Sequence, residues 1–220
     1  MDIRLGNKEL FFKMDKSTYK IPSKMYPLSS KSGISIFLDE NSKLIEDERV
    51  HKAVNLQKFK MGHCYSNTLS LIEYLSSLGV EAKPFAGWIF LGNNYPVHHA
   101  WVVLDGNVID GSVRKNEVDF LNDLAKQNLS QEELRAKYKD YLIREMNSKV
   151  PNSERIVLGD IPKGIVYVGS EDKPEEAKNR FRKTMDMFPI HPSYTGGMNG
   201  RGASKMQEEV IKSTKGQCLI

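Results

Sequence analysis

The sequence has only two cysteines in 220 residues, Cys64 inside an apolar segment and Cys218 near the C-terminus. That number excludes a small scaffold held together by disulfides. It also has no stretch of about 18 to 20 apolar residues, which a membrane span requires, and no apolar run of a secretion signal near Met1. From these absences we expect a cytoplasmic protein that does not enter a membrane.

A strong bias toward one sign of charge is also missing. The chain has 32 basic and 28 acidic side chains, a formal net charge of +4, and no long block of either sign. This balance gives no reason to expect nucleic acid or an anionic membrane surface as a partner. A hydrophobic share of 40% and a charged share of 27% are typical of soluble globular proteins.

The length suits one domain with extensions rather than several domains. We expect a single domain over residues 1–188, with its core at about 34–170 and an irregular N-terminal extension over 1–33 that contains at most one short strand. The segment 189–220 is rich in Gly, Ser and Pro at its start and predicts a tail with a short helix.

The clearest local pattern is a helix in the centre of the chain. Leu69, Ile72, Leu75 and Leu78 recur at three-residue steps, and Gly79 follows them. This period predicts a helix that begins close to Cys64 and is buried along one side. After Gly79 the pattern changes to β-strands separated by turn residues, with strands expected at 80–91, 98–104 and 108–113.

The flanking segments add further helices and strands. Ser130 followed three residues later by Glu133 is a capping box, which marks the start of a helix. Other strands are expected at 34–38, 156–158 and 164–169, and helices at 45–59, 117–128, 130–146 and 174–187. Together these elements predict an α+β fold in which the central helix packs on an antiparallel sheet, with a helical insertion and irregular terminal extensions.

Cys64 is a candidate nucleophile because it begins that helix. A thiol attacks as its thiolate, and the free amide N–H groups at a helix N-terminus favour an anion there. Gly62, two residues earlier, would let a substrate backbone approach closely, and the backbone N–H of Cys64 itself could donate to an oxyanion. The alternative is that Cys64 is a small buried hydrophobic residue.

His99 and Asp110 are candidate partners of that thiol. If Asp105 and Gly106 form a two-residue type I′ turn, Leu104 lies opposite Asn107 and Trp101 opposite Asp110, which places Asp110 diagonal to His99 on one face of the sheet. A three-residue loop would turn Asp110 to the other face. The neighbouring His98 points the other way because side chains alternate along a strand.

Two further interpretations of this region stay open. Trp101 follows on the face of His99, where it either shields the His99–Asp110 pair beside a substrate cleft or is a core aromatic residue. Asp110 could alternatively be a turn residue before Gly111 and Ser112.

The segments GHCYSNTLSLIEYLSSLGVEAKPFAGWIFL and HHAWVVLDGNVIDGS, which lie within 61–113, resemble the transglutaminase-like branch of the papain-like cysteine enzyme superfamily. That family has a cysteine at the start of a helix, a His-Ala-Trp strand and an aspartate on the next strand. The resemblance implies a papain-like or transglutaminase-like core with Cys64 as nucleophile, His99 as general base and acid, and Asp110 as the residue that orients His99. It also suggests Gln57 as an oxyanion donor.

This interpretation predicts a thiol-dependent amide-bond hydrolase or acyl transferase. Its substrate would be a protein or peptide amide, and water, an amine or an acetyl donor would decide between peptidase or deamidase, transglutaminase and N-acetyltransferase. No cofactor and no metal are expected, because His63, Cys64, His98 and His99 occur as sequence neighbours whose side chains diverge. The alternative function is a catalytically silent binding protein with this fold.

Overall fold

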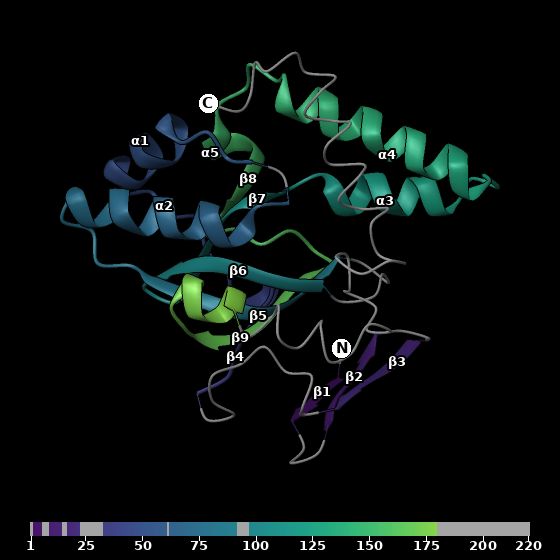
Figure 1. Ribbon diagram of the computed structural model, residues 1–220, viewed down its shortest axis with the longest axis horizontal. Coiled ribbons are helices and arrows are strands. Elements are labelled where there is room, and N and C mark those ends of the chain that lie inside the picture. Colours follow the sequence, from purple (N-terminus) through teal and green to yellow (C-terminus); the bar gives the residue numbers. More distant parts are fainter. Residues whose placement is uncertain are drawn as a thin grey trace.

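Figure 1 shows a computed structural model of the chain, which describes residues 2–5, 9–14, 17–22, 33–60, 62–91 and 97–179. The described part is an α+β fold built on a curled antiparallel sheet. The sheet has six strands in the order β4-β9-β5-β6-β7-β8. Their bounds are β4 (Ser35–Phe37), β5 (Lys83–Leu91), β6 (Val97–Leu104), β7 (Asn107–Arg114), β8 (Ile156–Leu158) and β9 (Ile165–Glu171).

One face of this sheet is covered by the helices α1 (Glu48–Leu56) and α2 (Cys64–Ser77), which lie next to each other in Figure 1. Asp47 caps α1 by accepting the backbone N–H of Arg49, and α2 ends before Gly79. The apolar side of the two helices packs on β6, β7 and β8. The buried residues of this cluster are Ile45, Val50, Ala53, Val54, Leu71, Leu75, Val80, Val102, Leu104, Ile109, Ile156 and Leu158.

The other face of the sheet is filled mainly by its own side chains. A second apolar cluster joins residues from β4 at one edge to β8 at the other, which the curl of the sheet makes possible. Its aromatic members touch edge to face or tilted: the ring centroids of Phe37 and Phe85 are 5.5 Å apart, and those of Trp101 and Tyr167 are 5.2 Å apart. Such contacts add stability beyond the buried area alone.

The helices α3 (Glu117–Ala125) and α4 (Gln131–Met146) follow β7 and lie side by side. Phe120 of α3 stacks on Tyr141 of α4 with ring centroids 4.3 Å apart. The capping box expected at Ser130 and Glu133 is confirmed, because the side chain of each accepts the backbone N–H of the other. The described residues also form a short helix, α5 (Asn152–Arg155), and a 3₁₀ turn, η2 (Asp39–Asn41).

The expectation of an irregular N-terminal extension is wrong. Residues 2–22 contain three antiparallel strands, β1 (Asp2–Leu5), β2 (Glu9–Met14) and β3 (Ser17–Pro22), which form a separate sheet in the order β1-β2-β3. Each strand is only four to six residues long, so no single one shows a sustained alternation. Pairing with the neighbouring strand, which supplies the missing backbone hydrogen bonds, stabilises them instead.

The remaining expected elements lie close to their predicted places, with shifted ends. Residues 174–179 are helical, and the rest of the helix expected at 174–187, like the tail at 189–220, lies outside the described residues. Within the described ranges, no helix combines the length and the apolar character that crossing a membrane would need.

Candidate active site

The hairpin between β6 and β7 has the predicted register. Asp105 and Gly106 both have positive φ, at 48° and 79°, as a type I′ turn requires. Leu104 lies opposite Asn107 and Val102 opposite Ile109. This register continued by one residue places Trp101 opposite Asp110, and therefore Asp110 on the same face as His99.

His99 and Asp110 are directly bonded across this hairpin. Nε2 of His99 lies 2.6 Å from Oδ2 of Asp110, and both side chains are buried, at 8% and 1% exposed. This bond excludes the two alternatives for Asp110, which were a turn residue and a residue on the other face of the sheet. Nε2 is occupied by the carboxylate, which leaves Nδ1 as the ring nitrogen that can face another group.

Asp110 receives two more hydrogen bonds from elsewhere in the fold. Its Oδ1 accepts the backbone N–H of Ser112 at 2.8 Å, and its Oδ2 also accepts the hydroxyl of Tyr167 at 2.9 Å. Tyr167 belongs to β9, 57 residues further along the chain. These three donors satisfy a carboxylate that is shielded from water, which a buried polar group requires.

Cys64 is the first residue of α2 and is partly exposed. It is a hydrogen-bond partner of His99, so His99 contacts Cys64 and Asp110 at once. Burial by itself lowers the pKa of His99, but the charges of Asp110 and Cys64, together with hydrogen bonds to both, raise that pKa to about 10. His99 is therefore a protonated imidazolium at neutral pH.

The first turn of α2, where Cys64 lies, has no side-chain cap. The N-cap residue His63 makes no side-chain hydrogen bond to the helix, and no acidic residue lies in the first turn. The first intrahelical bond of this turn runs from Asn67 N to His63 O, so the N–H of Cys64 has no acceptor within the helix. Burial, and then the charges of Lys60 and Lys178, lower the pKa of His63.

Asn67, one turn further along α2, connects this helix to the strand of Asp110. Its side chain is buried, at 7% exposed. Nδ2 donates to Ser112 Oγ at 2.8 Å and to Lys60 O at 2.8 Å, while Oδ1 accepts Lys60 N at 3.1 Å. One side chain thus joins the segment before Cys64, the helix that begins at Cys64 and the Asp110–Ser112 part of β7.

A buried polar network supports the same part of β7 from the side of α3 and α4. Arg114, which is 2% exposed, donates to Gly111 O at 2.9 Å and lies 3.8 Å from Glu145. Glu117 accepts Arg114 N at 3.3 Å and the Tyr138 hydroxyl at 2.7 Å, and its burial raises the pKa of its carboxyl. The charge of Asp110 adds to this rise, and the charge of Glu117 in turn raises the pKa of Tyr167.

Trp101 and His98 lie on opposite faces of β6. Trp101 is 1% exposed and stacks near His99, with ring centroids 6.3 Å apart and planes 15° apart. Its ring thus covers one side of His99 from within the core cluster, where it contacts no open surface. His98 instead packs edge to face against Trp88, with centroids 4.2 Å apart.

Gln57 is not brought to the thiol. It is the C-cap of α1, and its Oε1 accepts the hydroxyl of Ser70 at 2.9 Å. Ser70 lies six residues beyond Cys64 in α2, about 9 Å along the helix axis. The oxyanion role suggested for Gln57 therefore receives no support from its position.

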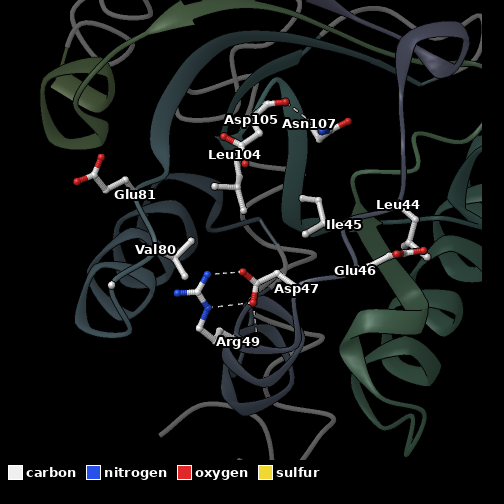
Figure 2. Close-up of a pocket in the computed structure, with 11 residues that line it drawn as sticks. Leu44, Ile45, Glu46, Asp47, Arg49, Val80, Glu81, Leu104, Asp105 and Asn107 are labelled. Atoms are coloured by element: carbon white, nitrogen blue, oxygen red, sulfur yellow. Dashed lines mark hydrogen bonds and ion pairs between the residues drawn. The ribbon is translucent and has the colours of Figure 1, made fainter.

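No group of three or more His, Cys, Asp or Glu side chains within the described ranges could hold a metal ion. Figure 2 shows a surface pocket of roughly 460 Å³ formed by the start of α1, the end of α2 and the β6–β7 turn. It lies beside Gly79 and Val80, whereas Cys64 is at the other end of α2, about 20 Å away along the helix. This pocket is separate from the Cys64 site.

No family model, curated protein or solved structure matches this chain. The chemistry of the site is therefore inferred from the contacts of its own residues.

Asn67, Ser112 and Tyr167 were not predicted from the sequence. Two of them carried a signal, because Asn67 is a polar residue in the first turns of a helix expected to be buried, and Tyr167 ends in a hydroxyl within an apolar strand. Buried polar groups nearly always have a hydrogen-bond partner. The signal predicts that a partner exists and leaves open which residue it is.

Proposed function

We propose that this chain is a cysteine-dependent enzyme that acts on amide bonds of a protein or peptide, built on a papain-like or transglutaminase-like core. The observation that carries the proposal is that His99 is bonded to Cys64 and Asp110 at the same time. A nucleophile, its acid-base partner and an orienting acceptor in one chain of hydrogen bonds are the arrangement that covalent thiol catalysis needs.

In the first step the thiolate of Cys64 attacks the amide carbonyl carbon and forms a carbon–sulfur bond. A protonated His99 and the helix N-terminus both favour the thiolate beforehand. The carbonyl oxygen becomes an oxyanion, and the backbone N–H of Cys64, which has no acceptor within α2, would donate to it. The carbon–nitrogen bond then breaks, and the amine leaves with the proton of His99, which leaves a thioester on Cys64.

In the second step neutral His99 removes a proton from the acceptor, which attacks the thioester and releases Cys64. Asp110 holds the ring so that Nε2 stays on its carboxylate and Nδ1 faces the sulfur. Water as acceptor gives hydrolysis, which we propose as the default because it requires no second binding site. An amine acceptor would instead give a new amide bond.

The test is active-site labelling and acyl trapping. We expect iodoacetamide to label Cys64 of the wild type rapidly at pH 6, where an ordinary thiol is almost entirely protonated. Because Cys218 is also present in the chain, the measurement uses a Cys218→Ser background, and the labelled site is identified by peptide mass spectrometry. Incubation with a peptide amide library should then yield a mass adduct on Cys64 that hydroxylamine removes.

Two variants sharpen the test. Cys64→Ala should abolish labelling and turnover while keeping the circular dichroism spectrum, since the partly exposed thiol is replaced by a smaller group. Asp160→Asn alters a carboxylate that pairs with Lys115 outside the site and should label like the wild type. A wild-type thiol that reacts only with the pH dependence of a free cysteine would instead support the silent binding protein.

A further inference from the structure

Tyr167 comes from the strand furthest in sequence from the other members of the site, yet it bonds to the atom on which the site depends. Its hydroxyl donates to Asp110 Oδ2 at 2.9 Å, the same oxygen that receives His99 Nε2 at 2.6 Å. β9 reaches this position because it inserts between β4 and β5 in the sheet. The two donors therefore share one oxygen.

We infer that Tyr167 is a positioning residue that sets how strongly Asp110 holds the proton of His99. This inference rests on the proposed function, because it concerns the same Cys64–His99 pair. The positive end of the Tyr167 hydroxyl dipole points at the oxygen next to the imidazolium. It draws negative charge away from His99 and so makes the imidazolium easier to deprotonate.

The surroundings of Tyr167 keep it in this role. The side chain is completely buried, with its ring 5.2 Å from Trp101 and 6.2 Å from His99. Burial, and then the charge and hydrogen bond of Asp110, raise the pKa of Tyr167 well above its usual value, so the phenol stays a neutral donor. An ordinary core tyrosine would need some acceptor, but not the carboxylate that holds His99.

The groups that face His99 limit what else could change its proton affinity. Cys64 of α2, Asp110 of β7 and Tyr167 of β9 bond to one another through His99 or Asp110. The charge of Glu117 of α3 acts on Tyr167, and the Glu117 carboxylate accepts the backbone N–H of Arg114. Of these residues, Tyr167 is the one whose hydrogen-bonding oxygen can be removed by a substitution to phenylalanine without a change of charge.

The experiment compares Tyr167→Phe with the wild type by NMR titration of the His99 ring nitrogens. We expect the pKa of His99 to rise by roughly half to one unit, since the second donor on Oδ2 is gone and more of its negative charge faces the imidazolium. The matched control is Tyr141→Phe, which removes the hydroxyl of another buried tyrosine that donates to the neutral amide of Asn116 at 2.9 Å and should leave His99 unchanged. An unchanged or lowered pKa in Tyr167→Phe would overturn the inference.

A second variant tests the opposite direction and does not depend on the stability of the first. Site-specific 3-fluorotyrosine at position 167 has a more acidic phenol that donates more strongly, so the pKa of His99 should fall. The Cys64 labelling profile of the wild type separates the two proposals. If the wild-type thiol is activated but the pKa of His99 does not change in either variant, only the role of Tyr167 is refuted. If the wild-type thiol reacts like an ordinary cysteine, the proposed enzymatic function is refuted.

Discussion

Asp110→Asn tests the central bond of the site with almost no change in shape. The carboxylate accepts from His99, Tyr167 and the Ser112 backbone, and it is only 1% exposed. An asparagine has one acceptor oxygen and one NH₂ group. Its NH₂ group would therefore face a hydrogen-bond donor where the carboxylate has an acceptor oxygen. The substitution removes the negative charge and cannot satisfy all three partners.

The expected effect on His99 follows from the contributions to its pKa. That pKa is about 10 against an ordinary 6.5, and burial alone would move it below 6.5. The gap of about 3.5 units corresponds to at most about 5 kcal/mol in favour of the imidazolium. Since Asp110 supplies one of the two charges and one of the two hydrogen bonds that raise the pKa, its removal should lower it by roughly two units or more.

The measurement is an NMR titration of His99 in Asp110→Asn, with the pH dependence of Cys64 alkylation as a second readout. We expect a lower His99 pKa and slower labelling of Cys64 near neutral pH, because less imidazolium is present to favour the thiolate. Asp160→Asn, which lies outside the site, serves as the control. A His99 pKa within half a unit of the wild type would refute the claim that Asp110 controls this histidine.

Three further predictions follow from other contacts. Asn67→Ala removes three hydrogen bonds and should lower the unfolding free energy by about 2 to 4 kcal/mol in urea titrations; a loss below about 0.5 kcal/mol would contradict its bridging role. Gln57→Ala should change turnover less than about twofold, whereas a loss of about 10² to 10³ would restore the oxyanion role. The raised pKa of His99 stabilises the fold fully below pH 6.5, so stability should decline as pH rises from 6.5 through about 10, and His99→Gln should flatten that decline.

Much of the site depends on local features and was predictable. The three-residue apolar period fixed the direction and start of α2, and therefore the place of Cys64, because helix formation depends on neighbouring residues. The Asp105–Gly106 turn likewise set the register that pairs His99 with Asp110, since only a two-residue turn puts them on one face. These predictions are confirmed.

Other features were predicted wrongly or not at all. The strands β1 to β3 were expected to be irregular, because each is short and depends on its neighbour for hydrogen bonds. Gln57 was placed near Cys64 by its spacing in sequence, but the way α1 packs on α2 joins it to Ser70 instead. The number of residues between Gln57 and Cys64 does not determine where the Gln57 side chain points, because a loop joins the two helices.

The sequence by itself therefore determined the α+β composition, the helix that begins at Cys64 and the hairpin that joins His99 to Asp110, because each follows from residues close together in the chain. Only the tertiary structure decided the insertion of β9 between β4 and β5, which brings the Tyr167 hydroxyl to Asp110. It also decided which atoms Asn67 joins. These contacts depend on how distant segments pack into one core, and no local pattern specifies that packing.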